Sequence, residues 1–153
     1  MNPPEIGAPA PELTLPDQDG QSFTLSDLRG ESAALLVFYP FAFSGICTGE
    51  LCTLRDGIGG FRTAGVQVVG VSCDPRHAQR AWAEQQGFDF PLLSDFWPHG
   101  DVARTYGVFD ERFGFALRGS FLVDHDGVLR WSVVNGPGEA RPFEAYQAAV
   151  ASL

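Results

Sequence analysis

Two apolar runs in the first half of the chain predict central strands of a sheet. The first covers 33–39 and the second covers 66–72, and both are typical of strands buried on their two faces. Between them, apolar residues recur close to helical spacing from about Cys47 to Arg62, after a loop that begins at Pro40. This order predicts a right-handed unit of strand, helix and parallel strand.

Shorter elements complete the predicted pattern in the second half of the chain. They are a helix, a weaker strand, a short helix, two strands and a terminal helix, at 75–86, 91–94, 101–106, 119–124, 128–134 and 142–151. Asp126-Gly127 lies between the last two strands and is a strong signal for a hairpin. The combined order predicts a thioredoxin-like α/β fold, in which a central mixed β-sheet is flanked by helices and carries extra N-terminal and central elements.

The composition fits one folded domain over residues 1–153. Hydrophobic residues make up 44% of the chain, charged residues 19% and aromatic residues 12%, which is too apolar for a disordered chain and sufficient for one core. No repeat, low-complexity tract or linker-like change in composition divides the sequence. We therefore expect a single domain.

The net charge and the N-terminal sequence limit which binding partners and which cellular location we expect. The formal net charge of −9 lacks the surplus of Lys and Arg that binding to nucleic acid or to an anionic membrane requires, so we expect neither partner. The first residues show no signal-peptide pattern, and no apolar stretch approaches 18 residues. We expect a soluble, cytoplasmic protein whose three cysteines are reactive or buried thiols rather than a structural disulfide framework.

Cys47 is the strongest candidate for chemistry. It lies at the start of a predicted helix, directly after a buried strand, so unpaired backbone N–H groups and the positive end of the helix dipole face its sulfur. Such surroundings favour the nucleophilic thiolate. The alternative is an inert cysteine buried at a helix start.

Pro40, Ser44 and Cys47 follow the spacing Pro-x-x-x-Thr/Ser-x-x-Cys, and Glu50 comes three residues later. This pattern resembles the signature of the peroxiredoxin family. The resemblance covers essentially the whole chain and implies the family's N-terminal hairpin and insertion. It is carried further by the segments 6–17, 70–74 and 118–124, and by 90–100, which is similar to the AhpE group.

The resemblance implies a role for each of these residues in a thiol-dependent peroxidase that reduces hydrogen peroxide and organic hydroperoxides. Cys47 would attack the peroxide and become a sulfenic acid. Ser44 would hydrogen-bond the peroxide and the thiolate, Arg118 would supply cationic donors, and Pro40 would shield the site from water. Glu50 would orient an arginine, expected to be Arg118.

Each assignment has a structural alternative. Ser44 can serve only as a helix cap, and Arg118 can form only a surface salt bridge. Glu50 can be favoured simply by the helix dipole. These readings stay open at the level of sequence.

Cys52 resembles the resolving cysteine of the Q-type peroxiredoxins, related to bacterioferritin comigratory protein, which share its Cys-x4-Cys spacing. AhpE proteins commonly lack it, so Cys52 is either a resolving thiol or a small apolar residue on the buried helix face. Residues five apart on an ideal helix have Cα atoms about 9 Å apart, beyond the limit of about 7 Å for a disulfide. A disulfide with Cys47 therefore requires the helix start to unwind. Without one, the enzyme would be a one-cysteine peroxidase resolved by an external thiol.

Cys73 ends a predicted buried strand and has no counterpart in the motif. We expect it to pack in the core, with an alternative resolving thiol as the other reading. A zinc site built from cysteines and His77 would lack the usual paired Cys knuckles, so no metal is expected.

No glycine-rich phosphate loop is present in the sequence, and no organic cofactor is expected. The expected partners are a peroxide, a thiol reductant and a second copy of the chain. The reductant could be thioredoxin, a mycoredoxin, glutaredoxin or a low-molecular-weight thiol, and the resemblance suggests a homodimer built near the active-site loops. Two rival functions remain: a thioredoxin-like disulfide reductase, which typically uses Cys-x-x-Cys, and a non-catalytic redox sensor.

Overall fold

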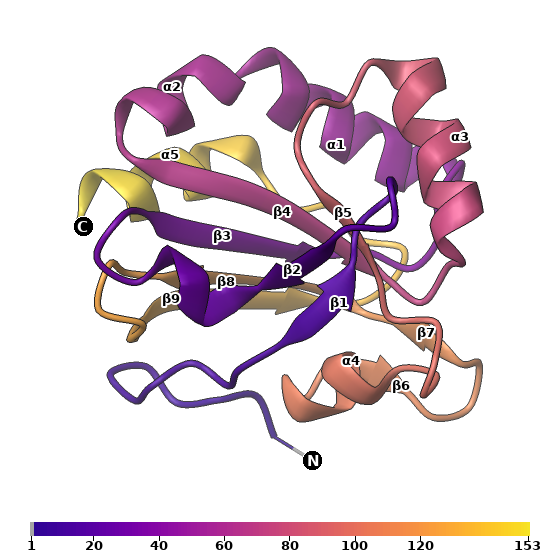
Figure 1. The fold of residues 1–153 in the computed structure, drawn as a ribbon, viewed down its shortest axis with the longest axis horizontal. Coiled ribbons are helices and arrows are strands. Elements are labelled where there is room, and N and C mark those ends of the chain that lie inside the picture. The colour runs from indigo at the N-terminus through magenta and orange to yellow at the C-terminus, as the bar shows by residue number, and fades with distance from the viewer. Residues whose placement is uncertain (1) are drawn as a thin grey trace.

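A five-stranded mixed sheet forms the centre of the computed structural model, which describes residues 2–153 (Figure 1). Met1, the first residue of the domain predicted over 1–153, lies outside the described residues. The strand order is β5-β4-β3-β8-β9. The bounds are β3 Ala33–Phe38, β4 Val66–Ser72, β5 Leu92–Ser94, β8 Arg118–Val123 and β9 Leu129–Asn135.

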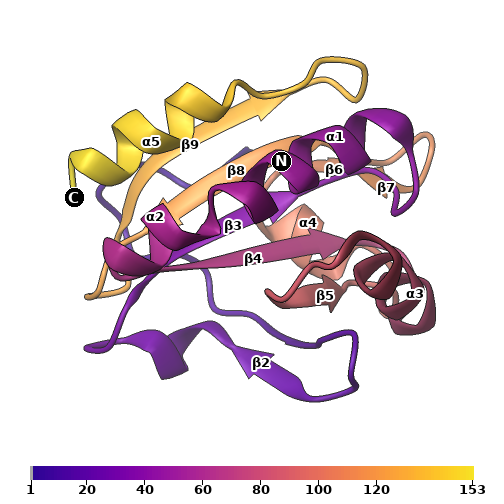
Figure 2. The same cartoon turned by 90° about the horizontal axis from the view of Figure 1, so that it is seen from above.

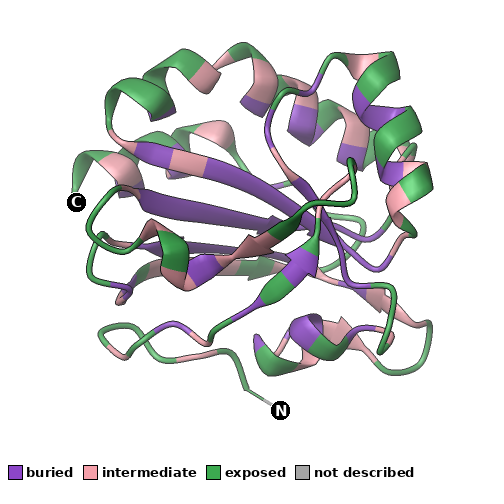
Figure 3. Ribbon diagram, in the orientation of Figure 1, coloured by how far each residue is buried: buried purple, intermediate pink, exposed green. Residues whose placement is uncertain are grey.

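β3 is the middle strand of the sheet, and every one of its residues is buried. It pairs in parallel with β4 and antiparallel with β8, so the predicted mixed sheet is confirmed. Alternate residues face two separate apolar clusters: Leu36 packs into one and Leu35 into the other. Figure 3 shows the central strands as the most continuously buried part of the chain.

Helices cover one face of the sheet. They are α1 Gly45–Asp56, α2 Ile58–Thr63, α3 Arg76–Gln86 and α5 Phe143–Ala151. In Figure 2, α1 and α2 follow one another across the sheet and α5 lies on the side of β9. Trp82 of α3 and Tyr146 of α5 join the apolar cluster on this face.

The single helix predicted over about 47–62 is wrong, because the chain forms two helices that meet at Gly57. Gly57 ends α1 and precedes α2, with φ −97° and ψ 9°. A Cβ at this position would lie 2.6 Å from Cζ of Phe143 in α5. The break thus allows close contact with a helix distant in sequence. The first helix also starts at Gly45, two residues earlier than expected.

The opposite face is covered by short elements and by the N-terminal part of the chain. An antiparallel hairpin, expected from the resemblance, is formed by β1 Thr14–Pro16 and β2 Ser22–Thr24, and the 3-10 helix η1 covers Leu25–Leu28. Further along the chain, α4 covers Asp101–Thr105, and β6 Phe109–Asp110 pairs with β7 Phe115–Ala116. β6 and β7 were not predicted, because two residues are too few to show a period.

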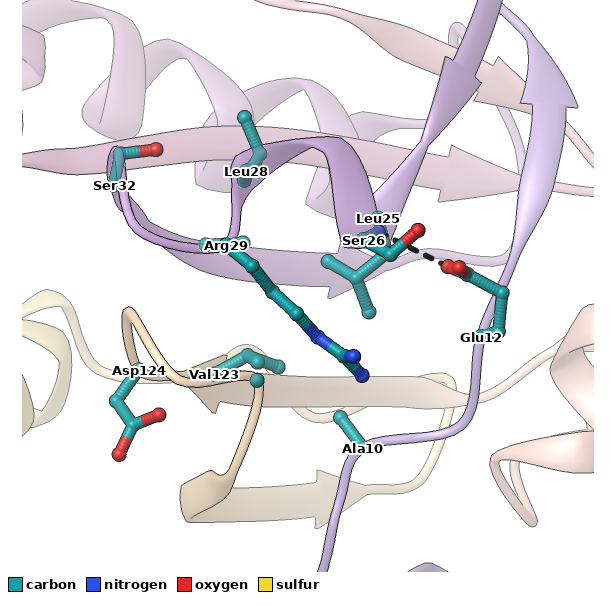
Figure 4. Close-up of a pocket in the computed structure, with 11 residues that line it drawn as sticks. Ala10, Glu12, Leu25, Ser26, Leu28, Arg29, Ser32, Val123 and Asp124 are labelled. Carbon is teal, nitrogen blue, oxygen red and sulfur yellow. Dashed lines mark hydrogen bonds between the residues drawn. The ribbon is translucent and has the colours of Figure 1, made fainter.

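The N-terminal segment is fastened to the turn between β8 and β9. Gly7 and Ala10 donate backbone N–H groups to the carbonyls of Leu129 and Gly127 at 2.8 and 2.9 Å. Figure 4 shows the carboxylate of Glu12 reaching Ser26 at the start of η1, where it accepts the backbone N–H at 3.1 Å. The N-terminal residues therefore close one side of the core instead of extending into solvent.

Across residues 2–153, none of the helices combines the length and the apolar character needed to cross a membrane.

Candidate active site

The antiparallel pairing of β3 and β8 brings Arg118 to the first turn of α1. β3 runs into the loop before α1, so the N-terminal end of β8 lies at the same edge of the sheet as Cys47. Arg118 Nη1 donates to Cys47 Sγ at 3.2 Å, and Arg118 is only 2% exposed. A guanidinium at this distance stabilises negative charge on sulfur, and burial strengthens the attraction because less water screens it.

The loop between β3 and α1 places Pro40 and Ser44 around Cys47. Ser44 is the N-cap residue of α1, with extended backbone, and its Oγ accepts the backbone N–H of Cys47 at 3.4 Å. The capping role considered for Ser44 is therefore present in the structure. Pro40, two residues after the end of β3, is buried, and Cys47 itself has no exposed surface. The start of the loop and the sulfur of Cys47 are therefore both buried.

Glu50 lies one helical turn after Cys47 and joins two arginines. Its Oε1 accepts from Arg118 Nη1 at 2.6 Å and from Arg141 Nη2 at 3.0 Å, while Oε2 accepts from Arg141 Nε at 3.0 Å. Burial alone would raise the pKa of Glu50, but the hydrogen bonds and charge of Arg141, and then the charge of Arg118, hold this pKa below its ordinary value. The carboxylate therefore stays charged and forms a buried ion pair with each of the two arginines.

Arg141 is the site residue that sequence reasoning missed. Its backbone N–H and guanidinium both bind Glu50, and Nη1 also donates to the carbonyls of Phe38 and Gly119 at 2.7 and 2.9 Å. It lies in the Gly- and Pro-rich segment before α5, where neither periodicity nor a motif marks it. A buried carboxylate signals the need for a cation, but the sequence offers ten arginines and does not identify which one.

The two remaining cysteines lie in different surroundings. Cys52 is half-buried in the same unbroken helix as Cys47, and its thiol donates to Gln86 Oε1 at 3.4 Å. Cys73 is buried at the end of β4, where burial, with the nearby charges of Asp95 and Asp74, raises its pKa to about 12. Cys73 is therefore a poor nucleophile. Cys47, Cys52 and Cys73 are all free thiols.

No group of three or more His, Cys, Asp and Glu side chains among residues 2–153 is arranged to hold a metal ion. The site brings together a buried thiol, a capping hydroxyl and one carboxylate that binds two arginines. This arrangement can stabilise an anionic nucleophile and the negative charge that develops on a group leaving it.

Comparisons with known proteins agree with the resemblance seen in the sequence. Residues 6–132 match the AhpC/TSA family. The chain is 47% identical over 148 residues to alkyl hydroperoxide reductase E of Mycobacterium tuberculosis, covering 97% of both chains. It is 38% identical over 135 residues to peroxiredoxin Bcp of Escherichia coli, covering 84% of this chain and 85% of the relative.

Solved structures show the same architecture. Peroxidoxin BcpB of Mycobacterium tuberculosis superposes with a TM-score of 0.86 at 31% identity, covering 97% of both chains. AhpC of Enterococcus faecalis superposes with a TM-score of 0.88 at 28% identity, covering 99% of this chain and 92% of that one. The thioredoxin-like α/β fold is therefore confirmed, and the chain belongs to the AhpC/TSA family of peroxiredoxins.

Proposed function

We propose that this protein is a thiol-dependent peroxidase in which Cys47 reduces hydrogen peroxide and organic hydroperoxides. The observation that carries the proposal is the buried contact of 3.2 Å between Arg118 Nη1 and Cys47 Sγ. The thiolate attacks the terminal peroxide oxygen, so an S–O bond forms and the O–O bond breaks. The leaving oxygen takes up a proton to become water or an alcohol, and the sulfur is left as a sulfenic acid.

The neighbouring residues divide the work of this step. Arg118 donates to the sulfur and to the peroxide oxygens, where negative charge is redistributed. Ser44 hydrogen-bonds the peroxide through the hydroxyl that caps α1, and Pro40 keeps water from the thiolate. Glu50 orients Arg118, with Arg141 holding Glu50 from the other side.

The second half of the cycle is assigned to Cys52. Its thiol attacks the sulfenic acid of Cys47, an S–S bond forms, and the hydroxyl group leaves as water. Because both cysteines lie in one helix, their Cα atoms are about 9 Å apart by ideal geometry, and the first turns of α1 must unwind before the disulfide forms. In a one-cysteine cycle, an external thiol would instead attack Cys47.

Intact-mass measurement after treatment of the reduced protein with one equivalent of hydrogen peroxide tests these assignments. A loss of about two daltons, with Cys47 and Cys52 joined, is the expected result. A gain of about sixteen daltons on Cys47 with Cys52 free would support the one-cysteine cycle. No mass change would reject the peroxidase. Consumption of many equivalents of peroxide per protein molecule in the presence of a reductant would exclude the non-catalytic redox sensor, which would be oxidised only stoichiometrically.

Residues 1–153 are proposed to form one domain of a cytoplasmic enzyme that is recycled by a thioredoxin-type protein, a mycoredoxin or a small thiol. A disulfide between Cys47 and Cys52 favours a thioredoxin-type reductant, since dithiols reduce disulfides by exchange. Reduction of the oxidised protein by purified thioredoxin, compared with a low-molecular-weight thiol alone, identifies the reductant. A faster reaction with the small thiol would contradict the preference.

A homodimer near the active-site loops is the proposed assembly. Large exposed apolar side chains lie in the loop before α1 and in the hairpin of β6 and β7: Phe41 is 47% exposed, Phe43 51% and Phe113 64%. Phe41 packs against Phe115 of β7, so the patch joins the loop between β3 and α1, residues 39–44 and here called the catalytic loop, to that hairpin. Light scattering is expected to give twice the chain mass of 16.6 kDa, and Phe113→Asp should halve the measured mass. A monomeric wild-type protein would contradict the assembly.

A further inference from the structure

The backbone of the catalytic loop is held by a carboxylate outside the site described above. Ala42 lies between Pro40 and Ser44, and its N–H donates to Asp74 Oδ2 at 2.8 Å. Asp74 follows β4, so this bond ties the loop to the neighbouring strand end. The next residue, Phe43, has φ +70°, a backbone conformation that is strained for a bulky side chain and persists only where surrounding contacts enforce it.

Asp74 is itself held by a chain of buried hydrogen bonds. Ser72 Oγ donates to Asp74 Oδ2 at 2.6 Å, and Gln79 Nε2 donates to Ser72 Oγ at 2.7 Å. Tyr39, which directly precedes Pro40, donates its hydroxyl to Gln79 Oε1. Ser72, Gln79 and Tyr39 have no exposed surface, so their orientations are fixed by these bonds.

This series of hydrogen bonds connects two points of the catalytic loop through neighbouring elements. It starts at Tyr39 after β3, passes through α3 and the end of β4, and returns to the loop at Ala42. Both donors to the Asp74 carboxylate bind the same oxygen, Oδ2, which makes Asp74 the terminal acceptor of the chain. In residues 2–153, every buried side-chain nitrogen and oxygen has a partner, so no member can change direction without leaving a buried group unpaired.

We infer that Asp74 is a positioning residue for the peroxide step, acting through the Ala42 N–H to fix the loop that presents Pro40 and Ser44 to Cys47. This inference rests on the proposed peroxidase function and extends it to a residue that touches neither sulfur nor peroxide. Misplacing such a loop by about 1 Å is sufficient to lower a rate about a hundredfold. The rate at which Cys47 reacts with a reagent that does not have to bind in a defined orientation should be lowered much less.

The test compares two reactions of Cys47 in Asp74→Ala and Asp74→Asn. Asparagine is the conservative control, because both bonds to Asp74 use one oxygen, which a side-chain amide retains. Stopped-flow fluorescence gives the rate constant with hydrogen peroxide, and mass spectrometry gives the alkylation rate with iodoacetamide. We expect Asp74→Ala to lose about 10- to 100-fold in the peroxide reaction and less than about threefold in alkylation. Asp74→Asn should stay within about threefold of wild type in both.

Equal losses in the two reactions, or a peroxide rate unchanged in Asp74→Ala, would overturn the inference. Amide exchange at Ala42 in the wild-type protein provides a test that does not depend on the folding of a variant. The N–H should exchange slowly for a loop position, and unprotected exchange would overturn the inference as well. A wild-type protein that does not react with peroxide would instead count against the proposed function, while the Ala42 measurement would still decide the contact.

Discussion

At the scale of single residues, Arg118 contacts the sulfur of Cys47 from the first position of β8. Replacing it with alanine should lower the rate constant of the wild-type reaction with hydrogen peroxide by about 100- to 1000-fold, because one preorganised charged donor is lost. Arg80→Ala is the matched control, since Glu84, also exposed on α3, is the only salt-bridge partner of Arg80 within residues 2–153. The two variants are compared by stopped-flow fluorescence. A loss of less than about fivefold in Arg118→Ala would contradict the assigned role.

The predictability of the site also differs from residue to residue. Pro40, Ser44 and Cys47 lie within eight positions, so their proximity follows from a short local segment. Arg118 was identified only because the resemblance extends to its segment. Arg141 could not be identified at all, because its partners include a carboxylate 91 residues away, two backbone carbonyls and the hydroxyl of Ser120, which are brought together only when the sheet forms.

At the scale of secondary-structure elements, we expect the buried carboxyl group of Asp95 to make the free energy of unfolding depend on pH. It lies between β5 and α4, is almost fully buried, and accepts the N–H groups of Val102 and Ala103 at 3.1 and 2.9 Å. Burial raises its pKa to about 6, against about 4 in the unfolded chain. The folded state therefore binds more protons between these values, and the cost of the buried charge decreases as the pH falls from 7 towards 4.

Urea unfolding at pH 7 and pH 5 measures this effect, with Asp95→Ser as the non-titrating control. Relative to the control, the wild-type free energy of unfolding should rise by about 1 kcal/mol at the lower pH. Equal changes in the two proteins would exclude Asp95 as the source.

Helix α1 must open if Cys52 resolves Cys47, although three side-chain hydrogen bonds among the described residues hold it to α3, one of them from Arg55 Nη1 to the carbonyl of Gln86. Trp82 Nε1 donates to Thr48 Oγ1 at 3.3 Å, and the thiol of Cys52 donates to Gln86. Hydrogen exchange should accelerate about tenfold or more at the amides of 47–53 after oxidation of the wild-type protein, because local unwinding exposes them. Cys52→Ser should keep its protection after the same treatment. An oxidised, disulfide-bonded protein with α1 intact would disprove the unwinding.

The elements that the sequence predicted well are those with a strong local pattern. β3 and β4 have buried residues on both faces, and the hairpin turn has Gly127 at φ +82°, as the Asp-Gly signal requires. The break at Gly57 escaped prediction because its reason is Phe143, a side chain of a remote helix. Local patterns therefore predicted the layers, while the positions of their interruptions depend on tertiary packing.

On the scale of the whole molecule, the N-terminal segment acts as a strap between the β8–β9 turn and α4. Tyr106, at the end of α4, donates its hydroxyl to the carbonyl of Pro11 at 2.6 Å. Tyr106→Phe should lower the free energy of unfolding by about 1 kcal/mol, the net value of one such bond. It should also speed proteolysis within the first ten residues. Unchanged urea unfolding would show that the strap is held by its backbone bonds alone.

The long range of the site contacts has a consequence for the newly synthesised chain. Cys47 bonds to Arg118 across 71 positions, and Glu50 bonds to Arg141 across 91. Because a protein leaves the ribosome from its N-terminus, the thiol emerges well before either arginine. Under the proposed mechanism, a nascent chain therefore carries Cys47 without the two arginines, and we expect its fast reaction with peroxide to begin only after Arg141 has been translated and packed.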